Sequence, residues 1–187
     1  MWSSKERSKS RAPSANDGRC CERGQKLGIS GGSEAQMSTI TTWFRLVTIS
    51  RRTSDDILRS THGRFHDVSQ DGPTTYLADR PETAILEVQG WLGVPMNPKG
   101  FELYRVLVET NEAFREVSDP ALLTDPASER CKEEARQARE SGDLGLKYPS
   151  MRNRPDGACL ALFLEHRGQR LKVSIERVPR TEWEFLT

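Results

Sequence analysis

Apolar and β-branched residues cluster in short runs that predict the strands of this protein. Residues 42–49 (TWFRLVTI), 74–78 (TTYLA) and 101–109 (FELYRVLVE) are rich in the aromatic and β-branched residues typical of strands. Residues 158–165 and 170–178 predict a β-hairpin that closes over the sequence RGQ. Together these runs predict the sheet of the domain.

A helix is predicted over about residues 80–92. Asp79 is the predicted N-cap residue of this helix. Pro81 then falls in the first turn, which proline suits, and Glu82 stands three residues after the cap. At about 100° per residue, the apolar residues on one face of this helix are Ala84, Ile85, Val88, Trp91 and Leu92. Glu87 falls on the flank of that face, so we expect its carboxylate to be half-desolvated at the border of the core.

The order of the predicted elements favours an α+β fold, a single compact domain with a mixed sheet and flanking helices. A second helix, polar on most sides, is predicted over residues 128–141, and strands and helices do not alternate as they do in a doubly wound sheet. Residues 1–36 are rich in Ser, Gly, Lys and Arg and offer little to pack. We interpret them as a disordered tail, or as an extension before the true start at Met37, and assign residues 37–187 to the domain.

Composition excludes several classes of partner. The 28 Lys and Arg against 27 Asp and Glu leave a net charge of +1, which provides no global field for nucleic acid or an anionic membrane. No apolar run approaches the roughly 20 residues that span a bilayer, and the N-terminus lacks the apolar stretch of a secretory signal. We therefore expect a cytoplasmic protein with no direct nucleic-acid or membrane partner.

Common catalytic and metal-binding motifs are absent from the sequence. It contains no P-loop, no strand-linked G-x-G-x-x-G, no H-E-x-x-H, no G-x-S-x-G and no C-x-x-C pair among its four cysteines. His62 and His66 are four apart, a spacing that suits a metal on a helix, but Gly63 and the loop-like surroundings argue against a helix there. No metal site is expected.

Five polar residues lie within otherwise packable segments: Arg45, Arg64, Tyr76, Glu87 and Ser150. The stretches that hold them are WFRL, GRF, TYLA followed by PETAILEV, and YPS, and the chain then continues into GACLALF. In order and spacing these stretches resemble the RES domain, a family named for its Arg, Glu and Ser. The resemblance covers about residues 43–178. Leu46 and the pair Phe65-His66 depart from the residues that often follow the two arginines in that family.

The resemblance implies a function and a partner. RES proteins are typically the toxin half of a bacterial toxin–antitoxin pair, their fold resembles ADP-ribosyltransferase toxins, and they deplete NAD+ by hydrolysis or phosphorolysis. It therefore implies that this chain cleaves the bond between nicotinamide and ribose, with NAD+ as substrate and no further cofactor. The implied protein partner is a DNA-binding antitoxin of the Xre type. A homo-oligomer is left open.

Residue roles carried over from the family agree with the chemistry of the side chains. Arg45 and Arg64 are implied to hold the phosphates, which planar guanidinium donors match well. Glu87 is implied to support cleavage, since a carboxylate stabilises positive charge on the ribose. Tyr76 is implied to pack on the cationic nicotinamide end, and Ser150 to position the substrate by hydrogen bonding. Glu87, Arg64 and Tyr76 are thus the expected catalytic set, and Arg45, Arg64, Tyr76 and Ser150 the expected NAD+ contacts.

Other interpretations of the same residues remain open. An ADP-ribosyltransferase would use the same NAD+ contacts but pass the ribosyl group to a protein. A catalytically inactive module would act only by binding a partner. An effector delivered into a competing cell would share the chemistry and differ only in location.

Overall fold

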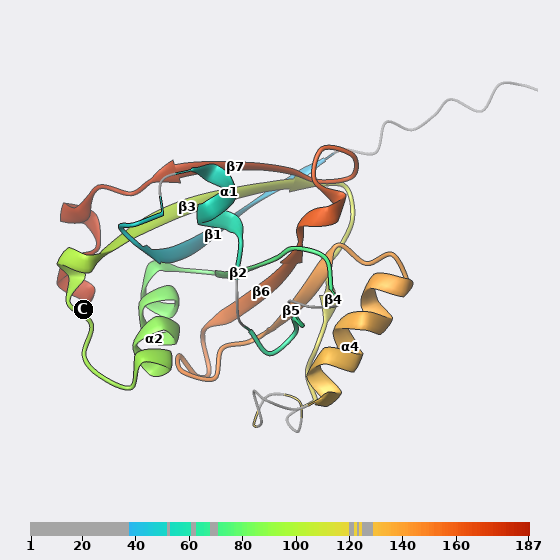
Figure 1. Ribbon diagram of the computed structural model, residues 1–187, viewed down its shortest axis with the longest axis horizontal. Helices are drawn as coiled ribbons and strands as arrows, with labels where there is room; N and C mark the ends of the chain where they lie inside the picture. Colours follow the sequence, from blue (N-terminus) through green and yellow to red (C-terminus); the bar gives the residue numbers. More distant parts are fainter. Residues whose placement is uncertain are drawn as a thin grey trace, which may run out of the picture. The chain divides into compact units, whose positions relative to one another are not determined.

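Seven strands of the described chain form one mixed sheet in the order β4-β5-β6-β2-β1-β3-β7 (Figure 1). The computed structural model describes residues 38–51, 53–60, 63–67, 71–119, 122, 124 and 129–187. The predicted tail, Met37 and His62 lie outside the described residues. The strands are β1 (Thr39–Thr48), β2 (Thr74–Ala78), β3 (Phe101–Thr110), β4 (Arg115–Glu116), β5 (Gly145–Pro149), β6 (Ala158–Phe163) and β7 (Lys172–Arg177).

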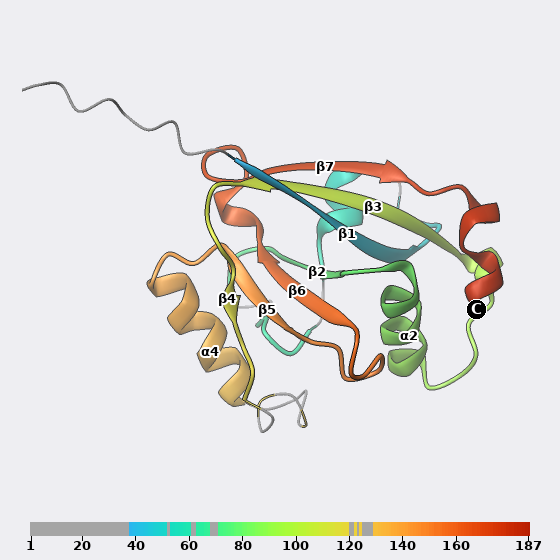
Figure 2. The same cartoon turned by 180° about the vertical axis from the view of Figure 1, so that it is seen from behind.

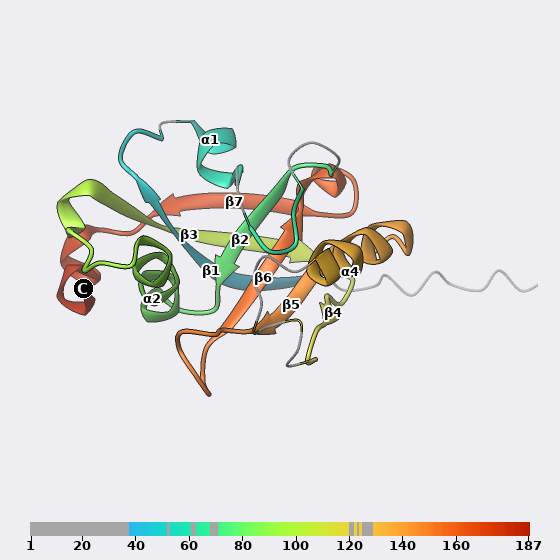
Figure 3. The same cartoon turned by 60° about the horizontal axis from the view of Figure 1, so that its bottom comes forward.

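Three α-helices have bounds within the described part of the chain. They are α1 (Ser54–Leu58), α2 (Pro81–Leu92) and α4 (Glu129–Glu140), with short 3-10 turns at η1 (Pro98–Gly100), η2 (Leu164–His166), η3 (Arg180–Glu182) and η4 (Glu184–Leu186). Figure 3 shows α2 and α4 in front of the same side of the sheet. The prediction of a single compact α+β domain with a mixed sheet and flanking helices is confirmed. None of the described helices is long and apolar enough to cross a membrane.

The sheet consists of two groups of strands joined at one point. β1 and β3 pair antiparallel along their whole length, from Thr39 opposite Thr110 to Thr48 opposite Phe101. β1 and β2, in contrast, share the single register pair Phe44 and Ala78. Figure 2 shows β1, β3 and β7 running together while β5 and β6 run in another direction, and Figure 3 shows β2 running alongside β6. The backbone groups of β2 beyond that contact therefore need partners other than β1.

The core divides according to the face of the strands. On β2, Tyr76 packs with a cluster between α4 and the β5-β6 strands, and the next residue, Leu77, packs with Trp43, Val106 and Leu160 in a second cluster. Ala78 joins a third cluster with Ala84 and Ile85 of α2. Because side chains alternate along a strand, Tyr76 and Ala78 face the side that carries α2 and α4.

The predicted hairpin over 158–165 and 170–178 is wrong. β6 pairs with β2 and β5, whereas β7 pairs with β3 at the opposite edge of the sheet. The intervening segment forms η2 and a turn, in which an isolated β-bridge joins Arg167 and Leu171. A strand pattern indicates which face is buried, but it does not state which strand lies alongside.

Two details of α2 also differ from the prediction. The residue at the cap position is Arg80, not Asp79, and it makes no side-chain cap bond. Asp79 instead pairs with the Arg80 guanidinium at 3.3 Å. Trp91 is 75% exposed rather than part of the apolar face, because the side of the helix that packs on the sheet is narrower than the predicted stripe. Glu87 is half-buried, as predicted.

Candidate functional site

Glu87 of α2 is held by a buried serine. The Ser150 hydroxyl donates to Glu87 Oε1 at 2.6 Å, and Ser150 itself is fully buried at the end of β5. Thus two of the residues singled out in the sequence, 63 positions apart, are in direct contact. A short hydrogen bond from a hydroxyl to a carboxylate is among the stronger neutral-to-charged bonds in proteins.

The loop of residues 150–157, here the Ser150 loop, is tied to α2. Ser150 Oγ accepts the backbone N–H groups of Arg152 at 3.1 Å and Asn153 at 2.9 Å. Asn153 Nδ2 donates to Thr83 Oγ1 of α2 at 2.8 Å. A Cβ at Gly157 would lie 2.9 Å from that same threonine oxygen, so only glycine lets the loop close so tightly on the helix. Ser150 therefore has both its lone pairs and its proton engaged, which fixes the orientation of the Glu87 carboxylate.

Cys159 of β6 is a second neighbour of the same carboxylate oxygen. Its Sγ lies 3.8 Å from Glu87 Oε1, and the side chain is buried. Burial, together with the charge of Glu87, raises the pKa of the Cys159 thiol. The thiol is therefore protonated at neutral pH and acts as a weak donor to Glu87, not as a nucleophile.

Tyr76 is placed by the chain around Gly63. Its hydroxyl accepts the backbone N–H of Phe65 at 2.9 Å. A Cβ at Gly63 would lie 2.1 Å from Tyr76 Cε2, so the close approach of backbone and ring requires glycine. Burial raises the pKa of Tyr76, and the phenol stays neutral.

Arg64 supplies positive charge to the same group of residues. Its guanidinium lies 5.6 Å from the centroid of the Tyr148 ring. Burial raises the pKa of Tyr148 and of Cys159, and the charge of Arg64 opposes that rise at both residues and at Tyr76. Arg64 is thus within electrostatic reach of all three, which draws Arg64, Tyr76, Tyr148, Ser150, Cys159 and Glu87 into one site, here the Glu87 site.

Arg45 of β1 lies next to this site but is engaged by the protein. Its Nη1 donates to the carbonyl oxygen of Tyr76 at 2.8 Å, and its Nη2 donates to Ser60 Oγ at 3.0 Å and to the Arg59 carbonyl oxygen at 3.3 Å. Burial lowers the pKa of Arg45 to about 9, so it is charged at neutral pH. Its guanidinium is the hydrogen-bond donor to the Tyr76 carbonyl oxygen at the point where β2 no longer pairs with β1. That it also holds a phosphate stays a prediction.

The structure brings together four of the five residues singled out in the sequence: Arg64, Tyr76, Glu87 and Ser150. Tyr148 and Cys159 were missed as site residues. Tyr148 stands in the YPS stretch beside Ser150, which was a usable signal. Cys159 lies in an apolar run, and nothing in that run indicates that its thiol faces a carboxylate. Among the described residues there is no group of three or more potential metal ligands.

Two cavities of the described chain lie away from the Glu87 site. One of about 620 Å³ is lined by residues of β4, of α4 and of the chain between them, and one of about 130 Å³ lies between β3 and the C-terminal turns. Neither includes a residue of the Glu87 site. The Glu87 site is therefore identified as the candidate functional site by its side-chain chemistry and not by cavity size.

Comparisons with known proteins found a matching family and a similar fold. The family profile described as the RES domain matches residues 42–186. The fold is similar to the crystal structure of the M. tuberculosis MbcT–MbcA toxin–antitoxin complex, with a TM-score of 0.53 and 14% sequence identity, over 80% of this chain and 90% of that chain. A search of curated proteins found no match. At this identity the structural likeness shows the fold.

Proposed function

Because this chain belongs to the RES domain family, we propose that it is the toxin of a toxin–antitoxin system and that it cleaves the bond between nicotinamide and ribose in NAD+. The observation that carries this proposal is the Glu87 carboxylate, half-buried and held through Oε1 by the Ser150 hydroxyl. A carboxylate fixed in this way is prepared to stabilise positive charge without reorganising during the reaction.

Glu87 is assigned the charge that develops on the ribose. When the glycosidic bond breaks, nicotinamide leaves with the bonding electron pair as a neutral molecule, and the ribose carbon becomes cationic. Ser150 and Cys159 both approach Oε1, so Oε2 is the oxygen directed to the ribose. An acceptor, water or inorganic phosphate, then forms the new bond to that carbon, and in hydrolysis the water's second proton passes to solvent.

Arg64 and the aromatic residues are assigned to the rest of the substrate. The guanidinium of Arg64 offers planar donors for a pyrophosphate oxygen pair. Tyr76 and Tyr148 are neutral aromatic rings in the same site, and an aromatic face attracts the cationic pyridinium. Loss of that cation on cleavage weakens this attraction, which helps nicotinamide to leave.

Ser150 is assigned as a positioning residue. Its single proton is donated to Glu87 and its oxygen accepts two backbone N–H groups. A direct bond to substrate would require it to release one of these partners. The role proposed here, acting through Glu87, therefore replaces the substrate contact expected from the sequence.

The test is nicotinamide release by the purified full chain incubated with NAD+, with and without inorganic phosphate. We expect release by the parent chain and a loss of at least about a hundredfold in Glu87→Gln, which keeps the shape but removes the charge. Glu82→Gln is the matched control, because Glu82 lies on the same helix and is exposed. Dependence on phosphate would identify the acceptor.

Failure of the folded parent chain to release nicotinamide would overturn the proposal. Equal activity of Glu87→Gln and Glu82→Gln would remove Glu87 from the mechanism. Transfer of labelled ADP-ribose to protein in a lysate, without free ADP-ribose, would replace hydrolysis or phosphorolysis by ADP-ribosyl transfer.

We also propose a cognate antitoxin of the Xre type as the protein partner. Its support is the family and the likeness in fold to a toxin solved with its antitoxin. Co-expression of the neighbouring gene should suppress nicotinamide release, and the product of that gene should co-purify with the chain. A neighbouring product that neither binds nor inhibits would contradict the pairing.

A further inference from the structure

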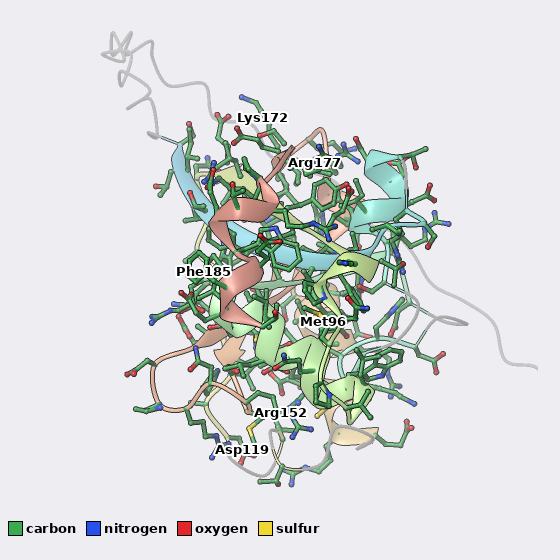
Figure 4. All side chains as sticks on the ribbon, turned by 90° about the vertical axis from the view of Figure 1, so that its left-hand side faces the viewer. Met96, Asp119, Arg152, Lys172, Arg177 and Phe185 are labelled. Carbon is green, nitrogen blue, oxygen red and sulfur yellow. The ribbon has the colours of Figure 1, made fainter. Side chains whose placement is uncertain are left out.

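Arg152 lies across α2 beside the Glu87 site. A Cβ placed on Gly90 would be 2.4 Å from Arg152 Nε and 2.8 Å from its Cδ and Cζ, so the side chain rests directly on the bare backbone of the helix. Figure 4 shows Arg152 next to α2. Gly90 thus leaves room for a guanidinium on the turn that follows Glu87.

The charge of Arg152 is not balanced by a carboxylate within the described chain. Among the described residues its side chain donates only to the Gly90 carbonyl oxygen, at a long 3.4 Å. Other arginines at the surface of this protein pair with acids, as Arg105 does with Glu176 and Arg177 with Glu102. An exposed arginine held in place with free donors is suited to bind an anion from solution.

The position of Arg152 is coupled to that of Glu87. Its backbone N–H donates to Ser150 Oγ, which in turn donates to Glu87 Oε1. The same short loop therefore orients the carboxylate and carries the cation. A substrate that carries a phosphate near the reacting ribose can therefore place its ribose at Glu87 and its phosphate at Arg152.

Trp91 extends this surface. It follows Glu87 by four residues, one helical turn of about 5.4 Å further along the same face. Long side chains on a helix lean over the turn that precedes them, which directs Trp91 toward Glu87. The side chain is 75% exposed, an unusual position for a tryptophan that no packing in the domain explains.

We propose that Arg152 and Trp91 form a second subsite along α2, in which Arg152 binds a phosphate of the substrate and Trp91 stacks on its adenine base. The inference rests on the proposed function and assigns residues to the half of NAD+ that lies beyond the nicotinamide riboside. Glu87 acts on the ribose next to nicotinamide, and the distal half of the molecule extends along the helix. The enzyme then prefers NAD+ over nicotinamide mononucleotide and over the phosphate-free nicotinamide riboside.

Equilibrium binding to the Glu87→Gln chain, which leaves the ligands uncleaved, tests this subsite. Three ligands form a series: NAD+, nicotinamide mononucleotide and nicotinamide riboside. Adding Arg152→Gln should lower the affinity for NAD+ and for the mononucleotide about tenfold and leave the affinity for the riboside unchanged. Adding Trp91→Ala should weaken NAD+ alone, since only NAD+ carries adenine.

Matched controls separate this subsite from general effects of charge and exposure. Arg154→Gln removes a charge from the same loop, where the Arg154 side chain contacts Met151, and should change none of the three affinities. Phe185→Ala removes another exposed aromatic side chain, 72% exposed near the C-terminus, and should also have no effect. Equal weakening of all three ligands by Arg152→Gln would show a structural role and overturn the subsite.

The outcomes also separate this inference from the proposed function. In one case the parent chain releases nicotinamide, but the Arg152→Gln and Trp91→Ala variants bind NAD+ as tightly as their controls. Only the subsite then fails. If the parent chain releases no nicotinamide, the proposed function fails, whatever the binding series shows. Absence of NAD+ binding to the Glu87→Gln chain would overturn the subsite as well.

Discussion

Ser150 is the small side chain through which its own loop is joined to Glu87 of α2. Its hydroxyl joins two backbone N–H groups of its own loop to the carboxylate of Glu87 on another element. Because all its bonding capacity is used, losing the hydroxyl should affect both the loop and the carboxylate. The two effects can be measured separately.

For Ser150→Ala we expect kcat for nicotinamide release to fall about tenfold to a hundredfold, since a misplaced carboxylate costs rate more than binding. The affinity of the Glu87→Gln chain for NAD+ should be little changed by adding Ser150→Ala. The free energy of unfolding should fall by about 1–3 kcal/mol, because two N–H groups lose their acceptor. Ser150→Thr, which keeps a hydroxyl, is the comparison. Loss of NAD+ affinity with unchanged kcat would show that the serine contacts substrate instead.

His66 is a buried titratable residue outside the catalytic assignment. It is 7% exposed, and its Nδ1 has no hydrogen-bond partner among the described residues. Burial, helped by the charge of Arg139, lowers the pKa of His66 below its usual 6.5, against the opposing charges of Asp71, Asp67 and Glu165. The folded protein therefore favours the neutral imidazole.

Acidification should consequently destabilise the protein through His66. The unfolded chain takes up the proton near pH 6.5, before the folded one does. The contribution of His66 to the free energy of unfolding is then constant above that pH and declines as the pH falls from 6.5 to the lower folded pKa. Urea unfolding of the parent chain and of His66→Asn from pH 8 to pH 5 measures it. A stability difference that does not change over this range would contradict the prediction.

Among the elements, β5 depends on how closely it approaches β6. Gly145 lies opposite Leu162 in this antiparallel pair. A Cβ at Gly145 would be 2.6 Å from the Ala161 carbonyl oxygen, a backbone atom that cannot move without displacing the ladder. The strand leads directly to Ser150, so its register also determines where the Ser150 loop begins.

Gly145→Ala should lower the free energy of unfolding by about 1–3 kcal/mol, the usual cost of forcing extra volume into a packed region. Gly100→Ala is the control, since a Cβ there would meet nothing within 4 Å. Denaturant unfolding of the two variants gives the comparison. Equal stability of both would mean that β5 and β6 separate at little cost.

For the molecule as a whole, Arg45 is the residue that ties the two groups of strands together. Its guanidinium reaches from β1 to the Tyr76 carbonyl of β2, beyond the single register pair that joins these strands. It also holds the chain at Arg59 and Ser60. The same arginine was expected from the sequence to bind phosphate, and these two roles make different demands on the side chain.

Arg45→Lys distinguishes them, because lysine keeps the charge but cannot reproduce the planar fork. If the bridge dominates, the free energy of unfolding should fall by about 2–4 kcal/mol, since buried carbonyl groups lose their donors. If phosphate binding dominates, the affinity for NAD+ should fall and stability should hold. Thermal unfolding and NAD+ titration of a Glu87→Gln chain with and without Arg45→Lys separate the two.

How much of this could be predicted differs between the fold and the site. The strands at residues 42–49, 74–78 and 101–109 and the helix containing Glu87 were recognisable, because burial of one face imposes a periodic pattern on the sequence itself. β5 was missed, since five residues that include Gly145, Lys147 and Pro149 show little of the pattern of a strand. Trp91 was assigned to the core because sequence periodicity gives only the direction of a side chain around the helix axis. It does not show how far along the helix the sheet extends.

The sequence by itself determined the α+β class, five of the seven strand segments of the sheet, and the five polar residues from which the site was predicted, since these depend on local periodicity and on residue type. Only the tertiary structure decided that β6 and β7 lie apart, that Arg45 spans the junction of the two groups of strands, and that Ser150 bonds Glu87 across 63 positions. Contacts of this kind join residues remote in the chain. They arise when strands select neighbours by the packing of the whole core, a choice that no local pattern records.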